Sequence, residues 1–280
     1  MPEINYGKIV IEALKKDAFS RRSLPMIGTV ILAAIFILML VLNSFRLPSI
    51  VGAAFDSFGI LFFALKIPLI RLIFWIITLF FGGVVIKQAG EDAKGEQISL
   101  KESFSFVKNK FLSLVAAGII IVVVPAIINM GVYNDPYFSD SLSLIVSILI
   151  ALLVFVTYPC IVLGERGAID AISVSIHHFI ENILQVFSIW LLSSVINLVI
   201  TFIFAIPLIV ILPDLAFLLL QFPYLYLPSM SSVTVFAAIT VVISAIGIAI
   251  ALVFSYGVTA RYYNEAIGRT EEDGDGGDVE

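Results

Sequence analysis

Six apolar runs, each long enough to cross a bilayer as a helix, limit what this chain can fold into more than any other feature of its sequence. A transmembrane helix needs about 20 mainly apolar residues, because the hydrocarbon core of a bilayer is about 30 Å thick. The runs cover residues 26–45, 67–86, 111–130, 142–163, 186–212 and 233–256. With 60% hydrophobic and 13% charged residues, the composition also lies outside the range of soluble domains. We therefore predict an all-α polytopic membrane protein with six transmembrane helices.

The lysines and arginines are distributed unevenly around these runs. Of the 16 in the chain, all but Arg46, Lys66 and Arg71 fall on the side that carries both ends of the chain. Because positive residues are retained on the cytoplasmic side of a membrane, this bias predicts a multi-pass protein of the cell membrane with both termini in the cytoplasm.

A short amphipathic segment precedes the first, third and fifth runs. Each contains an acidic, a small and an apolar residue in succession, at positions 12–14, 102–104 and 170–172. We interpret this periodicity as an internal repeat. It predicts three hairpins of two spans, each introduced by an interfacial helix, with an approximate threefold relation between them. Residues 1–268 are expected to form a single membrane domain, followed by a disordered acidic tail at 269–280.

The second and third segments have distinct apolar and polar sides. The second begins at Ser99 with capping-box spacing to Glu102 and has a stripe of Leu100, Phe104, Val107 and Phe111. On its polar side lie Lys101, Ser105, Lys108 and Asn109. The stripe of the third comprises Ile169, Ile172, Ile176, Phe179 and Ile183, opposite Asp170, Ser173, His177 and Glu181. Two interpretations stay open, a simple anchor at the membrane interface or a docking surface for anionic lipid or a partner.

Residues 158–172 carry a resemblance to known proteins. They place Pro159 near the end of the fourth run, then an acidic and glycine-containing turn at 164–167, then an acidic, alanine and apolar helix start. This pattern is similar to six-helix prokaryotic and archaeal membrane families of unknown function, and to the membrane domain attached to some glycerophosphodiester phosphodiesterases. Residues 84–110 look like the matching junction. The resemblance implies a fold and no activity, because the phosphodiesterase chemistry belongs to a separate soluble barrel.

Polar residues inside the apolar runs are candidates for ligand binding. Lys66, just before the second run, and Arg71, within it, flank Pro68. They predict either an anchor on outer-leaflet phosphates, or a buried arginine that faces a cavity or a lipid-headgroup site. Ser193, Asn197 and Thr201 recur every four residues in the fifth run. They predict hydrogen bonds between helices or, alternatively, a polar transport path.

Small residues recur every three or four positions in the sixth run. They are Ala237, Thr240, Ser244, Gly247, Ala251 and Ser255. Such a stripe lets a neighbouring backbone approach closely, so we expect it to pack against another helix.

No catalytic or cofactor-binding motif occurs in the sequence. One cysteine, Cys160, excludes an intrachain disulfide, and neither the tail aspartates nor adjacent His177 and His178 have metal-ligand spacing. We expect a non-enzymatic protein, without metal, cofactor or nucleic acid, that binds membrane lipids or a membrane partner, such as a second copy of itself. The alternative is a permease for a small or amphipathic solute. The candidate ligand or lipid-binding residues are Lys66, Arg71, Lys101, Lys108, Ser193, Asn197 and Thr201.

Overall fold

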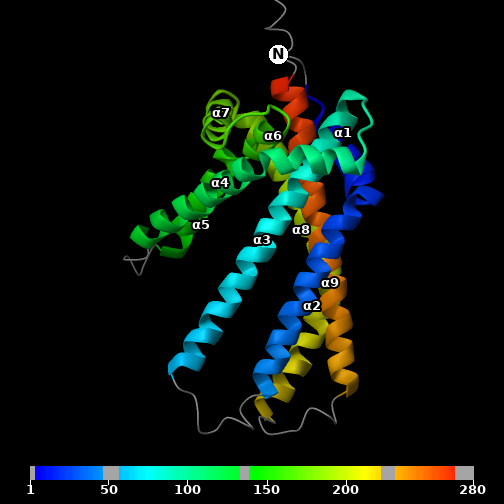
Figure 1. Ribbon diagram of the computed structural model, residues 1–280, viewed down its shortest axis with the longest axis vertical. Coiled ribbons are helices and arrows are strands. Elements are labelled where there is room, and N and C mark those ends of the chain that lie inside the picture. The colour runs from blue at the N-terminus through cyan, green and yellow to red at the C-terminus, as the bar shows by residue number, and fades with distance from the viewer. Residues whose placement is uncertain (1–3, 47–56, 133–138, 222–230, 269–280) are drawn as a thin grey trace, which may run out of the picture. The chain divides into compact units, whose positions relative to one another are not determined.

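The computed structural model describes residues 4–46, 57–132, 139–221 and 231–268, and over these residues the chain contains helices and no strand (Figure 1). Side chains are described for 4–36, 68–128, 141–210 and 238–268. The long helices are α2 (Leu24–Arg46), α3 (Ser57–Lys94), α4 (Leu100–Val132), α8 (Ile183–Gln221) and α9 (Ser231–Tyr263). The shorter ones are α1 (Tyr6–Glu12), α5 (Ser139–Leu153), α6 (Thr157–Val162) and α7 (Ala168–Glu181). The predicted acidic tail lies outside the described residues, as does the side chain of Lys66.

Five helical stretches in the described residues are long and apolar enough to cross a membrane. They are Pro68–Lys94, Leu100–Ile128, Ser141–Val162, Ile183–Val210 and Ala238–Gly268. A sixth results if Tyr6–Ala18 and Arg21–Phe36, which meet at a bend of 66°, form one broken span. The predicted class, an all-helical chain with multiple apolar spans, is confirmed.

Two helices extend further than their apolar runs. α3 continues beyond residue 86 to Lys94, and α9 continues beyond residue 256 to Tyr263. These extensions carry Glu91, Asp92 and Arg261, charged residues that hydropathy alone places outside the spans. The ends of the two helices therefore bring charged side chains together.

The chain divides into two compact units. Unit 1 comprises Met1–Arg22, Leu79–Ile196 and Val253–Glu280, and unit 2 comprises Ser23–Thr78 and Asn197–Leu252. The expectation of a single domain over residues 1–268 stays a prediction, and each unit is described by itself.

Unit 2 contains the predicted small-residue packing between α8 and α9. The Ser244 hydroxyl donates to the Phe204 carbonyl at 3.2 Å, and a Cβ at Gly247 would lie 2.2 Å from the Phe204 Cβ. Thr240 and Ala251 of the same stripe are also buried. The prediction that this stripe allows close helix approach is confirmed.

In unit 1, the second amphipathic segment is the beginning of α4. The Ser99 N–H donates to the Glu102 carboxylate at 2.9 Å, and the Glu102 N–H donates to the Ser99 hydroxyl at 3.2 Å. The capping box is thus confirmed. Val107 of the stripe is fully buried, and the Phe104 ring packs against those of Phe80 and Phe81 in α3. The segment is continuous with the third span, and its apolar side packs on protein, which differs from a separate interfacial helix.

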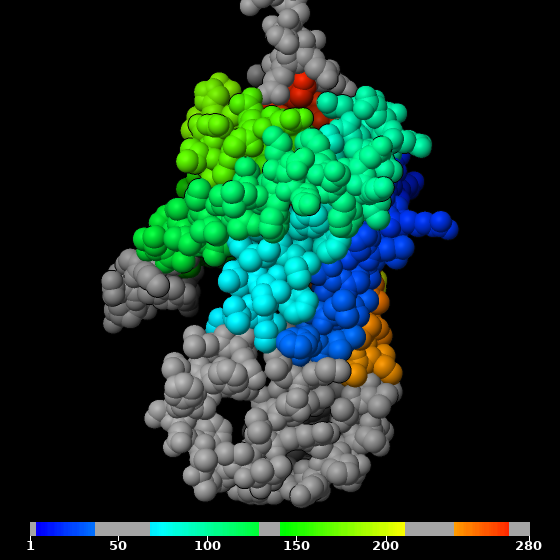
Figure 2. Space-filling model, in the orientation of Figure 1, coloured from blue at the N-terminus to red at the C-terminus, as the bar shows by residue number. Residues whose placement is uncertain are grey.

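The third segment is a distinct helix, α7, which lies at the surface of unit 1 beside α4 (Figure 2). It contacts a break in the fourth span, where α5 ends at Leu153 and α6 begins at Thr157. The break precedes Pro159, which lacks an N–H and crowds the carbonyl four residues earlier. The Ser175 hydroxyl donates to the Leu153 carbonyl at 2.8 Å and accepts from the Val156 N–H at 3.3 Å. Ser175 therefore takes the place of helical hydrogen bonds at the break.

His178 ties α7 to α9. Its Nε2 lies 3.0 Å from the Tyr262 hydroxyl oxygen, and its Nδ1 lies 3.4 Å from the Asn182 amide nitrogen. Because an amide nitrogen only donates, Nδ1 accepts and Nε2–H donates to Tyr262. Burial lowers the pKa of His178 below its ordinary value, since the charged imidazolium would lose its hydration.

Candidate functional site

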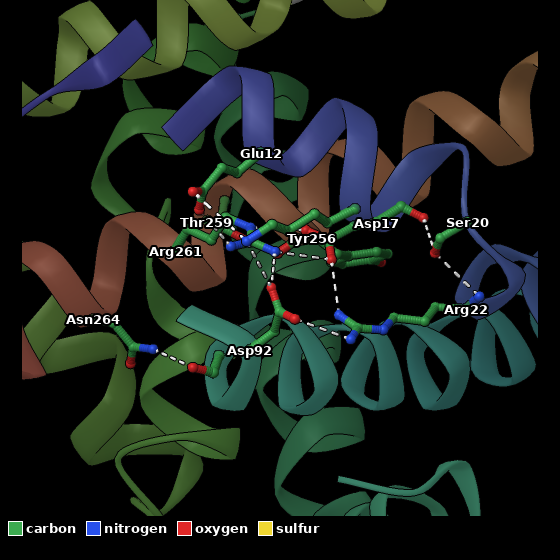
Figure 3. Close-up of polar contacts among 11 residues, drawn as sticks. Glu12, Asp17, Ser20, Arg22, Asp92, Tyr256, Thr259, Arg261 and Asn264 are labelled. Carbon is green, nitrogen blue, oxygen red and sulfur yellow. Dashed lines mark hydrogen bonds and ion pairs between the residues drawn. The ribbon is translucent and has the colours of Figure 1, made fainter. Parts of the chain in front are cut away.

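A group of charged side chains from three separated parts of the sequence converges in unit 1 (Figure 3). We call it the charge cluster, and it consists of Glu12, Lys16, Asp17, Arg22, Asp92 and Arg261. The N-terminal segment supplies four of these residues, the last turn of α3 supplies Asp92, and the last turn of α9 supplies Arg261. The cluster therefore joins the N-terminal segment to the ends of two long helices.

Arg261 is the centre of the charge cluster. Its Nε and Nη2 donate to the two carboxylate oxygens of Asp17 at 2.9 and 3.2 Å. Its Nη1 donates to Glu12 and its Nη2 also donates to Asp92, both at 2.9 Å. The side chains of Arg261 and Asp17 are only 2% and 1% exposed. This is the forked, bidentate geometry that the planar guanidinium favours.

Two further cations complete the charge balance. Arg22 donates to Asp92 at 3.0 Å and lies 3.5 Å from an Asp17 oxygen. The Lys16 ammonium lies 3.7 Å from both Glu12 and Asp92. Three carboxylates thus meet three cations. Each buried charge has an opposite charge within hydrogen-bonding distance, as a buried ion needs.

Local backbone features bring Asp17 into position. Residues Ala13–Ala18 form a π-helical segment, in which the Phe19 N–H bonds to the Leu14 carbonyl five residues earlier. On the opposing helix, a Cβ at Gly257 would lie 2.7 Å from the Asp17 Oδ2. Position 257 therefore requires glycine, because a Cβ there would keep the Asp17 carboxylate from reaching Arg261.

The cluster acts chemically as a set of fixed ion pairs. Every carboxylate in it is bound to arginine, so none is free to act as a general base. Among the described residues, no group of three or more histidine, cysteine, aspartate or glutamate side chains could hold a metal ion. The arrangement is suited to fastening the N-terminal segment, because breaking a buried ion pair from one side costs about 3–5 kcal/mol.

The predicted ligand residues in the second and fifth runs have separate environments. Arg71 is exposed in unit 2. Ser193 is buried, and its hydroxyl donates to the Trp190 carbonyl at 2.9 Å in its own helix. Asn197 and Thr201 are half-buried on the same side of α8. The hydrogen bond of Ser193 is therefore made within α8, where the sequence predicts a bond to another helix.

The predicted lysines Lys101 and Lys108 lie on the exposed side of α4. Within the part of unit 1 that the structure describes, they belong to a set of exposed cations without an ion-pair partner. The set is Lys8, Lys15, Arg21, Lys101 and Lys108. Lys16 and Arg22, by contrast, bind carboxylates of the charge cluster.

Sequence reasoning did not identify the charge cluster. It used Arg22 and Arg261 only to predict orientation, and it placed Glu12 and Lys16 on the polar side of the first amphipathic segment. The available signals are Glu91 and Asp92, five and six residues after the end of one apolar run, and Arg261, five residues after the end of another. These signals show that charges lie close to helix ends, but they do not show that the ends converge.

No family model, curated protein or solved structure matches this chain. The similarity to six-helix membrane families stays a prediction from residues 158–172.

Proposed function

We propose that this chain is a non-enzymatic, multi-pass protein of the cell membrane that binds anionic lipid headgroups through the exposed cations of unit 1. The observation that carries the proposal is the division of the basic residues into two groups. Those facing the interior neutralise carboxylates, whereas Lys101 and Lys108 are exposed and have no ion-pair partner among the described residues. Lysines without a carboxylate partner are available to bind the phosphate of a lipid headgroup.

Electrostatics supports this assignment. A lysine or arginine near an anionic membrane surface contributes about 1 kcal/mol to binding, so several acting together give a marked lipid preference. With the positive-inside bias of the sequence, the proposal puts unit 1's charged end and both termini in the cytoplasm. It also retains the three-hairpin arrangement as the proposed finer architecture.

The absence of a free carboxylate in the charge cluster supports a non-enzymatic role. A membrane partner or second copy is the alternative ligand of the same surface. The permease alternative relies on Ser193, Asn197 and Thr201 in α8. The hydrogen bond of Ser193 lies within its own helix, so it does not support a transport path.

Native mass spectrometry of the full chain tests the proposal. The protein is released from micelles containing equal amounts of phosphatidylglycerol and phosphatidylcholine, and the retained lipids are counted. We expect phosphatidylglycerol to be enriched, and Lys101→Glu with Lys108→Glu to lower that enrichment by about thirtyfold, since the two lysines together contribute about 2 kcal/mol.

The matched control is Lys101→Arg with Lys108→Arg, which keeps both charges and should keep the enrichment. An equal lipid ratio in the wild type and both variants would overturn the proposal. Retention of a small solute in place of lipid would favour the permease.

A further inference from the structure

Helix α7 presents three sides, because an α-helix advances about 100° per residue. The side against the protein is formed by the buried residues Ala171, Ser175, His178 and Phe179. The polar side is formed by the exposed residues Asp170, Ser173, His177 and Glu181. Between them lies an isoleucine stripe, formed by Ile169, Ile172, Ile176 and Ile180.

The isoleucine stripe is not covered by unit 1. Ile169 is 75% exposed and Ile180 is 61% exposed, while Ile172 and Ile176 are half-buried. The helix cannot rotate to bury the stripe without breaking the bonds of Ser175 to the α5–α6 break and of His178 to Tyr262. The uncovered stripe is thus a fixed feature of how α7 is docked.

The stripe continues directly into a helix that is long and apolar enough to span a membrane. Asn182 alone separates α7 from α8, and the first residues of α8, Ile183 and Leu184, are 52% and 80% exposed. Residues Ile183–Val210 form one of the candidate spans. Exposed apolar residues of α7 are therefore followed along the chain by exposed apolar residues at the start of a candidate span.

We infer that the isoleucine stripe of α7 is a docking surface for the bilayer itself, with its side chains among the acyl chains just below the headgroups. Three sides suit this position, since a helix lying in the interface needs one apolar side towards lipid and one polar side towards water. The third side binds the protein. A soluble partner would not need the continuity with α8, which favours lipid as the occupant.

This inference does not depend on the lysines of the proposed function. The polar side of α7 carries Asp170 and Glu181, so anionic headgroups add nothing to its attachment. Burial of apolar side chains drives the docking, and it should occur equally in membranes without anionic lipid. The two proposals can therefore fail separately.

Spin labels placed on the two exposed sides of α7 test the inference. Single cysteines are introduced as Ile169→Cys and Ile180→Cys on the stripe, and as Ser173→Cys and His177→Cys on the polar side. The one native cysteine, Cys160, is fully buried, so the wild-type chain serves as the labelling blank. All four positions are exposed, which limits any effect of the label on folding.

The labelled full-length proteins are reconstituted into phosphatidylcholine vesicles, and collisions with oxygen and with a water-soluble nickel chelate are measured by power saturation. We expect the ratio of oxygen to nickel collisions to be several-fold higher at 169 and 180 than at 173 and 177. Equal or reversed ratios would overturn the inference. Low collision rates with both reagents at 169 and 180 would also overturn it, because a protein would then cover the stripe.

Discussion

Two short helical segments of unit 1 precede apolar spans, yet they are fastened by different chemistry. Residues 6–18 bury Ile9, Val10 and Ala13 and are held by ion pairs from Asp17 and Glu12 to Arg261. Helix α7 is held by neutral hydrogen bonds from Ser175 and His178.

The two kinds of attachment differ in how easily they can be broken. A segment held by buried charges cannot leave without exposing or stranding them, at a cost of about 3–5 kcal/mol. Neutral hydrogen bonds contribute about 1 kcal/mol each. The N-terminal segment is therefore the more firmly fastened of the two, whereas we propose that α7 shares its attachment between protein and membrane.

Removal of Arg261 should have the largest effect. In Arg261→Met, the buried carboxylate of Asp17 loses both of its closest donors, so we expect the free energy of unfolding to fall by about 3–5 kcal/mol. Denaturant titration of the protein in lipid–detergent micelles measures this change. Arg21→Met is the matched control, because Arg21 is exposed, and it should change stability by less than about 0.5 kcal/mol. Equal effects of the two changes would show that the N-terminal segment is not held by charge.

A methyl group at position 257 should have an intermediate effect. The added Cβ of Gly257→Ala would lie 2.7 Å from the Asp17 Oδ2 and 3.1 Å from its Cβ, which forces Asp17 away from Arg261. We expect a loss of about 1–3 kcal/mol in the same titration.

The control for this change is Gly28→Ala in α2. A Cβ there would meet nothing within 4 Å, and alanine favours a helix over glycine by up to about 1 kcal/mol. The control should therefore be neutral or stabilising. Equal destabilisation by Gly257→Ala and Gly28→Ala would show that the close approach of position 257 to Asp17 does not contribute to stability.

Acid should weaken the docking of α7 by a smaller amount. Burial lowers the pKa of His178 in the docked helix, while a free histidine titrates near pH 6.5. His178 therefore binds more protons when α7 is released from the protein than when it is docked. The contribution of His178 to the docking free energy is fully present above about pH 6.5 and is lost as the pH falls, by at most about 1.4 kcal/mol per pH unit. Glu181 opposes this shift, and His177 adds to it.

Hydrogen exchange of α7 amides at pH 7.5 and 5.5, corrected for intrinsic rates, measures this loss. His178→Gln should remove the pH dependence, whereas the exposed His177→Gln should retain most of it. An identical pH profile in both variants would contradict a role for His178.

Features that depend on neighbouring residues in the sequence were predictable. The sequence predicts the apolar runs, the capping box of Ser99 and Glu102, and the small-residue stripe with Gly247, and the structure contains each of them. Each is a local property, because hydropathy, capping and helix periodicity are decided within one or a few turns.

The faces of the amphipathic segments were predictable only in part. The second and third segments have the same kind of apolar stripe, yet Val107 is packed on protein and Ile169 is exposed. Periodicity identifies which residues share a side of a helix. It does not say whether protein or lipid covers that side, since both are apolar.

An all-helical chain with multiple membrane-length helices follows from the sequence alone, because an apolar run of that length and composition has few alternatives. The contact of Arg261 with Asp17, 244 positions away, and with Asp92, 169 positions away, is visible only in the folded chain. Ion pairing depends on which helix ends come together and on how far water is excluded there. Neither is encoded in any single stretch of the chain, so the residues that fasten the N-terminal segment became visible only in the folded protein.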